Sequence, residues 1–365
     1  MKYPAKSFRQ RCSVMVDFLK LRRDKGLTME EYDQFHMIDR PASFRQHFLG
    51  VNEQRYYLDL LNPVKYYILA RNKYVAHQML SAAGLPLATL FCYYDPEAGP
   101  QQGPQTAHNT EEVLRVLQAQ GVTSCVVKTT ETSHGSNVQV VTDIDYSQEG
   151  LCTFHDGSTC QMSSLLGNKP LMFESRIRQS AQMATFNDSS VNTVRFMTLL
   201  FPDGTAEVAA TFIKIGRSGR CVDNAGAGGN VDACVDTATG TLQDAICFDG
   251  WEKITPVTHH PDSNAPLDGV QIEHWEEICT EVKRFQQAFP FVKAAGWDIA
   301  ITDNGPVIVE VNDMWDRTGQ LFIHRGWRND IRRCYMAWKN TNAQYEFGRL
   351  PNELSPRRLQ RIARK

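Results

Sequence analysis

The chain has 365 residues, of which 42% are hydrophobic and 22% charged, and its formal net charge is -2 at pH 7. This composition is ordinary for a globular protein, and the length suggests two domains or one large two-lobed domain with ample core. The nearly balanced charge argues against a general nucleic-acid-binding protein, although residues 356–365 are locally basic. Because no run of about 18 apolar residues occurs, we expect no membrane span.

The ten cysteines are scattered along the chain without a CxxC spacing. Such usage is typical of reduced and mostly buried thiols. The first residues also lack the apolar stretch of a signal peptide. We therefore expect a cytoplasmic protein.

The first part of the chain predicts helices. Residues 14–23 form one mixed-charge helical segment, and residues 28–38 form another that opens with a possible capping box of Thr28 and Glu31. A further amphipathic helix is predicted from Asn72 to the stop at Gly84. The next predicted elements are a strand over 88–94, a polar loop over 95–109, a helix over 111–121 and a strand over 123–128.

The later part of the chain predicts mainly strands. These cover 170–177, 192–201 and 206–216, and they precede a glycine-rich span over 225–236 and a helix over 273–289. Helices mixed with partly antiparallel strands indicate an α+β fold, as opposed to a regular doubly wound one.

Residues 296–312, GWDIAITDNGPVIVEVN, predict a hairpin with turn residues between two β-rich runs. If Thr302 pairs with Pro306, Asp298 lies opposite Glu310. Alternation along the strands then places Ile308 and Asn312 on the same face as the two carboxylates, and Val309 on the apolar face.

Two carboxylates directly opposite each other destabilise a sheet unless a cation lies between them. Asp298, Glu310 and Asn312 form an all-oxygen ligand set, which suits magnesium held together with substrate phosphates. The alternative is an exposed hairpin whose carboxylates point into water.

Three further stretches carry possible binding residues. Lys128 and the loop with Ser133, Gly135 and Ser136 predict a phosphate site without P-loop spacing, the alternative being a plain hairpin loop. The second stretch is a predicted strand that ends at Glu174, followed by Arg176 and Ile177. That strand end fits a ribose or adenine edge or, equally, an ordinary salt bridge.

Arg195 and Lys214 lie within apolar strands, where a charge is costly unless it is paired or faces a site. They would suit a cradle for a triphosphate and an anionic intermediate. The alternative is structural pairing with Asp298 and Glu310.

Taken in order, these stretches resemble the ATP-grasp superfamily, and most closely its sugar-transfer-associated branch. The resemblance runs from about Asn72 to Gln320. It is carried by NKYVAHQMLSAAGLPLA, VVKTTETSHGSNVQVV, VNTVRFMTLL, IGRSGRCVDNAGAGGNVDACVD and GWDIAITDNGPVIVEVN. Thr129 departs from the pattern, because a proline commonly follows the lysine there.

The resemblance implies an ATP-grasp fold of two α+β lobes that grip ATP. The implied divisions are a helical N-terminal segment at 1–70, an N-terminal lobe at 71–178, a C-terminal lobe at 179–335 and a basic tail at 336–365.

The resemblance also implies the roles of individual residues. Lys73 and Lys128 reach ATP phosphates, 133–136 is the closing loop, and Glu174 to Ile177 is the hinge that reads adenine. Asp298, Glu310 and Asn312 hold two Mg²⁺ ions, with Mn²⁺ as the alternative metal. Arg195 and Lys214 contact phosphates and the reacting carboxylate.

The expected function is an ATP-dependent carboxylate–amine ligase that works through an acyl phosphate and releases ADP and phosphate. The branch name suggests cell-surface polysaccharide or specialised-metabolite biosynthesis. The alternatives are a kinase for hydroxyl groups and a non-catalytic nucleotide-binding module.

Its partners would be a small-molecule or glycan carboxylate and an amine, and the sequence assigns no oligomeric state. Candidates for the substrate pocket are Asp223, Asn224, Gly228, Gly229, Gln320, His324 and Arg325. Cys221 and Cys234 are interpreted as buried thiols, because no paired histidine is evident.

Overall fold

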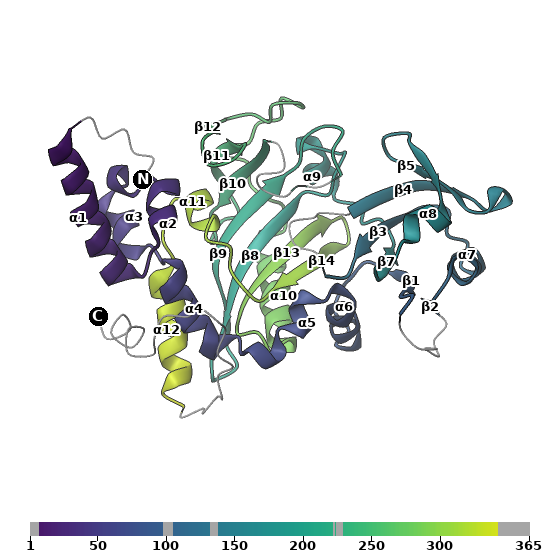
Figure 1. Ribbon diagram of the computed structural model, residues 1–365, viewed down its shortest axis with the longest axis horizontal. Helices are drawn as coiled ribbons and strands as arrows, with labels where there is room; N and C mark the ends of the chain where they lie inside the picture. The colour runs from purple at the N-terminus through teal and green to yellow at the C-terminus, as the bar shows by residue number, and fades with distance from the viewer. Residues whose placement is uncertain (1–6, 98–104, 132–137, 222, 224–228, 342–365) are drawn as a thin grey trace.

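The computed structural model describes residues 7–97, 105–131, 138–221, 223 and 229–341. Two seven-stranded sheets dominate this part of the chain (Figure 1). The first has the order β2-β1-β7-β3-β4-β5-β6 and the second β12-β11-β10-β9-β8-β13-β14. All named strand pairs are antiparallel except β1 with β2. The predicted α+β class is confirmed.

The strands of the first sheet come from residues 90–174 and those of the second from residues 193–312. Their bounds are β1 Leu90–Tyr94, β2 Thr106–Ala107, β3 Cys125–Thr129, β4 Val138–Asp145, β5 Leu151–Phe154, β6 Thr159–Gln161, β7 Leu171–Glu174, β8 Thr193–Leu200, β9 Ala206–Ile215, β10 Asn230–Val235, β11 Leu242–Phe248, β12 Ile254–Pro256, β13 Ala294–Thr302 and β14 Gly305–Asn312.

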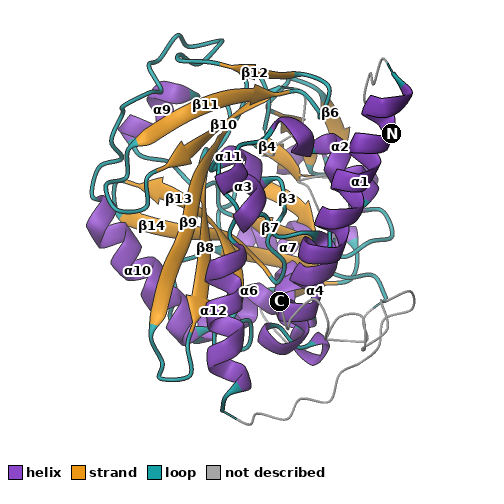
Figure 2. Ribbon diagram, turned by 90° about the vertical axis from the view of Figure 1, so that its left-hand side faces the viewer, coloured by secondary structure: helices purple, strands orange, loops and turns teal. Residues whose placement is uncertain are grey.

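The helices lie around the sheets (Figure 2). Their bounds are α1 Phe8–Lys25, α2 Met29–Gln34, α3 Ala42–His47, α4 Val51–Leu61, α5 Ile68–Arg71, α6 Lys73–Ala82, α7 Thr110–Ala119, α8 Met162–Leu166, α9 Ala181–Phe186, α10 Trp275–Ala288, α11 Gly319–Phe322 and α12 Arg328–Lys339, with short 3₁₀ turns η1 Met37–Asp39, η2 Val64–Tyr66 and η3 Tyr146–Gln148. Among the described helices, none is long and apolar enough to cross a membrane.

Side-chain caps fix where the first helices begin. Thr28 and Glu31 form the predicted capping box at the start of α2. The side chain of Asn72 accepts a hydrogen bond from the backbone of Val75, so Asn72 caps the helix and α6 begins at Lys73, one residue after the predicted start. This cap fixes the position of Lys73 at the first turn of α6.

Helices pack against both faces of the second sheet. One face packs against α10, where Phe196, Ile213 and Trp297 meet Val282 and Phe285. The other face packs against the N-terminal helices, α11 and α12. A separate core lies under the first sheet, where α7 and α8 cover it. Figure 1 shows the two sheets side by side, with the helices of residues 8–61 at the far end of the second one.

The hairpin of β13 and β14 differs from the predicted one near its turn. Thr302 pairs with Gly305, so the loop has two residues, and a bulge between Asp298 and Ile299 then restores the pairing of Asp298 with Glu310. The expected opposition of the two carboxylates is therefore correct, although the expected Thr302–Pro306 pair is wrong.

The bulge also exchanges two side chains between the faces. Ile308 pairs with Ile299 and is buried in the core under α10, although the alternation placed it on the face of Glu310. Val309 lines the cavity described below, although it was expected in the core. A single extra residue in one strand shifts the alternation in this way.

Candidate active site

A cleft lies between the two sheets, and its empty volume, including the part open to solvent, is about 1000 Å³. The strands β3, β4 and β7 supply one wall, and β8, β9, β13 and β14 supply the other. Most of the charged residues singled out in the sequence line it: Lys73, Lys128, Glu174, Arg176, Lys214, Asp223, Asp298 and Glu310. Residues from five distant parts of the chain thus meet in one cavity.

Asp298 on β13 lies between two cations. Its Oδ1 is 2.5 Å from Nε of Arg195, its Oδ2 accepts a second hydrogen bond from Nη2 of Arg195 at 2.7 Å, and Nζ of Lys214 is 3.0 Å from Oδ1. Strand pairing causes this arrangement, because Arg195 on β8 is directly opposite Asp298. Burial works against the charge, yet Arg195 and Lys214 lower the pKa of Asp298 to about 2.

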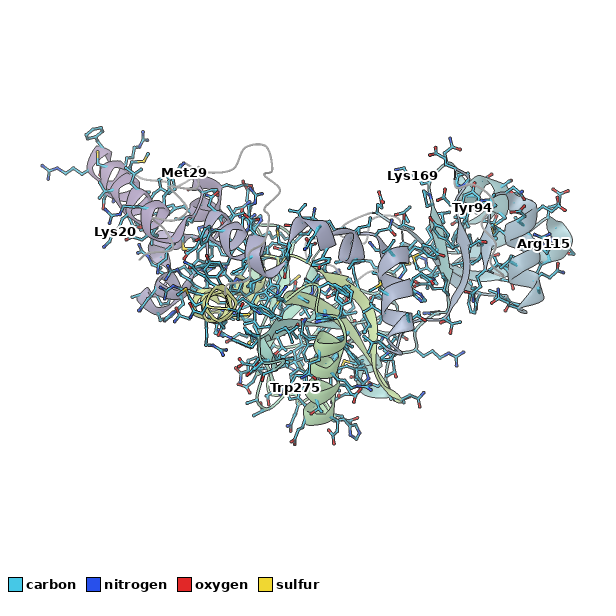
Figure 3. All side chains as sticks on the ribbon, turned by 90° about the horizontal axis from the view of Figure 1, so that it is seen from below. Lys20, Met29, Tyr94, Arg115, Lys169 and Trp275 are labelled. Atoms are coloured by element: carbon cyan, nitrogen blue, oxygen red, sulfur yellow. The ribbon has the colours of Figure 1, made fainter. Side chains whose placement is uncertain are left out.

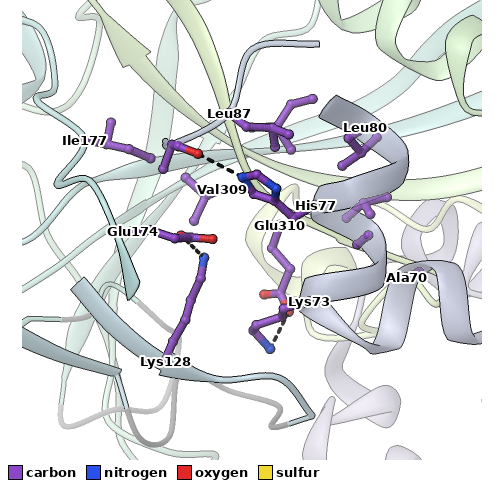
Figure 4. Close-up of a pocket in the computed structure, with 14 residues that line it drawn as sticks. Ala70, Lys73, His77, Leu80, Leu87, Lys128, Glu174, Ile177, Val309 and Glu310 are labelled. Atoms are coloured by element: carbon purple, nitrogen blue, oxygen red, sulfur yellow. Dashed lines mark hydrogen bonds and ion pairs between the residues drawn. The ribbon is translucent and has the colours of Figure 1, made fainter. Parts of the chain in front are cut away.

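Two further ion pairs lie within the cleft (Figure 4). Nζ of Lys73 is 3.2 Å from Oε1 of Glu310, and Nζ of Lys128 is 2.6 Å from Oε2 of Glu174. The first pair joins α6 to β14 and the second joins β3 to the neighbouring β7. Both lysines point into the same space from different elements.

Asp223 and Lys214 extend the polar cluster along the second sheet. Oδ2 of Asp223 accepts hydrogen bonds from the backbone and hydroxyl of Thr193, and its Oδ1 is 4.0 Å from Nζ of Lys214. Burial raises the pKa of Asp223, against the effect of Lys214. Asp223 is therefore a buried carboxylate held by Thr193 at the edge of the cleft.

Asp232 on β10 is a residue that the sequence did not single out. It pairs across the sheet with Lys214 and is fully buried. Neither carboxylate oxygen has a hydrogen-bond partner among the described residues. Burial raises its pKa well above the usual range of an aspartate. Its signal in the sequence was an aspartate inside an apolar run, which is the same signal that marked Lys214.

Aliphatic side chains supply the rest of the cleft wall. Val126 and Val140 from the first sheet face it, as do Ile177 and Val309. Apolar walls with a few polar groups are typical of small-molecule sites. A smaller neighbouring pocket, with about 460 Å³ of empty volume, continues under α6 and shares Lys73, Lys128, Glu174 and Glu310 with the cleft.

Several substrate candidates lie away from the cleft. Gln320 is fully buried and exchanges hydrogen bonds with both backbone groups of Leu49. His324 contacts the carbonyl of Asp244, and Arg325 pairs with Asp330 at 2.9 Å. The carbonyl of Gly229 accepts a hydrogen bond from Arg217 at 3.1 Å. None of these four residues lines the cleft.

The remaining candidates are placed as follows. Asn312 lies on β14 opposite Gly296, whose carbonyl accepts a hydrogen bond from the Asn312 amide at 3.3 Å. Ser133, Gly135, Ser136, Asn224 and Gly228 lie outside the described residues.

A cysteine–histidine pair bridges the two sides of the cleft. Sγ of Cys221, which lines the cleft, is 3.0 Å from Nδ1 of His155, which follows β5 in the first sheet. The expectation that Cys221 has no histidine nearby is thus corrected by a contact across 66 residues. Burial raises the pKa of the Cys221 thiol, which favours its neutral form.

The donor atoms of Asp298, Glu310 and Asn312 fit a hard cation. All are oxygens, and each carboxylate oxygen has more than one lone pair, so the contacts to Arg195, Lys214 and Lys73 leave further acceptor positions. Among the described residues no group of three or more His, Cys, Asp or Glu gathers as a metal centre. A cation here would therefore need the Asn312 amide or phosphate oxygens to complete its ligands.

The comparison with protein families identifies the class. The model of the sugar-transfer associated ATP-grasp family matches residues 52–334, which is most of the chain. This protein belongs to that family. The resemblance expected from the sequence is confirmed. No curated protein matches the chain.

Similar solved structures include phosphoribosylamine–glycine ligase from Thermotoga maritima, with a TM-score of 0.45 and 13% identity over 77% of this chain and 57% of that one. The VanG D-Ala:D-Ser ligase of Enterococcus faecalis gives a TM-score of 0.43 and 14% identity over 74% and 62%. Biotin carboxylase from Campylobacter jejuni gives 0.44 and 9% over 80% and 50%. The chain thus spans about half to two thirds of these structures. Because every TM-score here is below 0.5, the family assignment rests on the family model.

Proposed function

We propose that this protein is an ATP-dependent ligase that joins a carboxylate to an amine through an acyl phosphate. The observation that carries the proposal is the convergence of Lys73, Lys128 and Lys214 with Asp298 and Glu310 in one cleft between two sheets. Each of these five side chains comes from a different strand or helix, and together they would bind a shared anionic ligand. A triphosphate with its metal has the charge that such a cluster requires.

In this proposal the aliphatic walls hold the adenine ring near Ile177, and the triphosphate extends toward β13 and β14. Lys73 and Lys128 are within reach of phosphate oxygens once they leave Glu310 and Glu174. When bound at Asp298, Glu310 and Asn312, Mg²⁺ would reduce the negative charge on the phosphates and favour attack at the γ-phosphorus.

The substrate carboxylate oxygen attacks the γ-phosphorus. The bond between the γ-phosphorus and the bridging oxygen breaks, and ADP leaves with its electron pair. The amine then attacks the acyl carbon, the C–O bond to phosphate breaks, inorganic phosphate leaves, and the amine nitrogen loses a proton to water. In this proposal Arg195 and Lys214 stabilise the charge that develops on the acyl oxygen. Asp223, held by Thr193, would bind a donor group of the second substrate.

The test is the release of ADP and phosphate from Mg-ATP with a panel of carboxylic acids, with and without hydroxylamine as a general nucleophile. A carboxylate-dependent release that yields a hydroxamate supports the acyl phosphate. ADP release without free phosphate, together with a phosphorylated alcohol from a matched hydroxyl panel, would instead identify a kinase. Nucleotide binding without turnover in either panel counts against the ligase and favours a binding module.

Glu310→Gln is the variant of choice, because it keeps the shape of the side chain and removes its charge. Leu19→Glu, far from the cleft on α1, is a control for the general effect of a charge change. Activity that survives Glu310→Gln would contradict the metal assignment.

A further inference from the structure

The first helix has an apolar stripe on its outer side. Phe8, Cys12, Met15, Val16 and Leu19 follow one another at helical spacing and so lie on one face of α1. Phe8 is 82% exposed, Val16 67%, Leu19 54% and Met15 40%, and Cys12 is exposed as well. These four are half of the eight large hydrophobic side chains that are exposed in the described part of the chain.

A different face of α1 packs on the protein. Val14 and Phe18 are buried in the core that contains Tyr32 and Phe35, and Asp17 on the same side accepts hydrogen bonds from Tyr32 and Arg45. The outer stripe is therefore additional to what the fold needs. An exposed and contiguous apolar patch of this kind marks an interaction site.

Basic residues flank the stripe on both sides. At 3.6 residues per turn, Arg9, Lys20 and Arg23 lie along one edge, and Arg11 and Arg22 along the other. The helix carries six basic and two acidic residues, although the whole chain has a net charge of -2. Both acidic residues, Asp17 and Asp24, lie on other sides of α1, and Asp24 pairs with Arg23 at 3.0 Å. Positive charge is thus concentrated around the exposed apolar face.

The helix lies at one extremity of the molecule. Figure 3 shows Lys20 on α1 at the opposite end from Arg115 on α7, and Figure 1 shows α1 on the side of the second sheet away from the first sheet. A flat surface can therefore approach the stripe while the cleft between the sheets stays accessible.

We propose that α1 binds the surface of an anionic lipid bilayer, with its apolar stripe in the interface and its basic edges against lipid head groups. An apolar face with lysine and arginine along its edges is the pattern of an interfacial helix. The charge argues against a second copy of the chain, because two such helices would bring their basic edges together. It argues equally against the chain's own last segment, since residues 356–365 contain five basic residues and no acidic ones.

The test is sedimentation of the full chain with vesicles of phosphatidylcholine and phosphatidylglycerol, compared with phosphatidylcholine alone. We expect binding to the anionic vesicles, weaker binding to the neutral ones, and loss of binding as salt is raised. Leu19→Glu should weaken the binding to anionic vesicles at least about tenfold, because it replaces an apolar side chain that the lipid would bury by a charge that the anionic surface repels.

Ile68→Glu on α5 is the matched control, since Ile68 is 51% exposed but lies outside α1, and it should bind like the unmodified chain. Thermal unfolding checks that both variants fold. Equal binding to the two vesicle types, or equal binding by Leu19→Glu, would overturn the proposal. So would a dimer in light scattering that Leu19→Glu dissociates, because the stripe would then be a protein interface.

Discussion

Asp298 and Arg195 form a bidentate ion pair on neighbouring strands, with both carboxylate oxygens bound to one guanidinium and both side chains nearly buried. Lys214 approaches the same carboxylate. The buried charges are therefore mutually dependent, since removal of the one anion leaves two cations without it. Glu310, directly opposite in the sheet, is in a different situation, because its side chain is 31% exposed and pairs with Lys73 from another element.

This contrast predicts different costs for two matched substitutions. Asp298→Asn should lower the free energy of unfolding by about 3–5 kcal/mol, because Arg195 and Lys214 remain buried without their carboxylate. Glu310→Gln should cost less than about 1 kcal/mol, as expected for a partly exposed pair. Chemical denaturation of both variants measures the difference. Equal losses would show that the two carboxylates carry similar structural roles.

Asp232 predicts a pH-dependent stability. Because burial raises its pKa, the folded chain keeps a proton that the unfolded chain releases above about pH 4. Stability from this group is therefore lost as the pH rises from about 4 through the raised pKa. Asp232→Asn removes the titration, so the variant should gain stability relative to the unmodified chain as the pH increases. Urea unfolding at several pH values tests this, and parallel pH profiles would contradict it.

Lys293 predicts the opposite slope in an alkaline range. It is 5% exposed beside the ring of Trp338, and burial lowers its pKa to about 8. Between about pH 8 and the ordinary lysine value near 10.4, the unfolded chain binds the proton that the folded chain has released. Stability should therefore rise with pH across this window.

Lys293→Met should abolish that rise and stabilise the protein at neutral pH. Lys339→Met is the control, because Lys339 is an exposed lysine that also lies over an aromatic ring, that of Tyr335. Thermal unfolding between about pH 7 and 10 gives the comparison. A rise that persists in Lys293→Met would assign it to another group.

Cys221 predicts protection by nucleotide. It lines the cleft and is half-buried, and burial raises the pKa of its thiol, so a maleimide should modify it slowly. Mg-ATP in the cleft should slow the reaction further. Cys12 is exposed on α1 and serves as an internal control whose rate should not change. Mass spectrometry resolves the two sites, and equal rates at Cys221 with and without nucleotide would place the nucleotide elsewhere.

The local parts of the structure could be predicted from the sequence. Caps at Thr28 and Asn72, the helix of residues 275–288 and most strands follow from nearest neighbours along the chain. The pairing of Asp298 with Glu310 was also predicted, because a hairpin connects residues close in sequence.

What could not be predicted depends on distant contacts or on one extra residue. The bulge that turns Val309 into the cleft cannot be read from alternation, because alternation assumes an unbroken pair of strands. The approach of His155 to Cys221 joins two sheets. The burial of Gln320 depends on Leu49, 271 residues earlier. The burial of Asp232 beside Lys214 likewise depends on the pairing of β10 with β9.

The N-terminal helices are fastened to the chain that leaves the hairpin of β13 and β14. The side chain of Gln54 donates to the carbonyl of Trp315, that of Asn62 donates to the carbonyl of Asp313, and Arg317 pairs with Glu31. The family match begins at residue 52, so a fragment trimmed to that boundary would keep Gln54 and Asn62 but lose Glu31 and Leu49. Such a fragment would expose the face of the second sheet that Phe35 and Phe48 cover. The segment before the family boundary is thus part of the folding unit that holds Glu310 and Asn312. A protein shortened to that boundary would lose contacts that support the chain where it leaves β14, the strand that carries both residues.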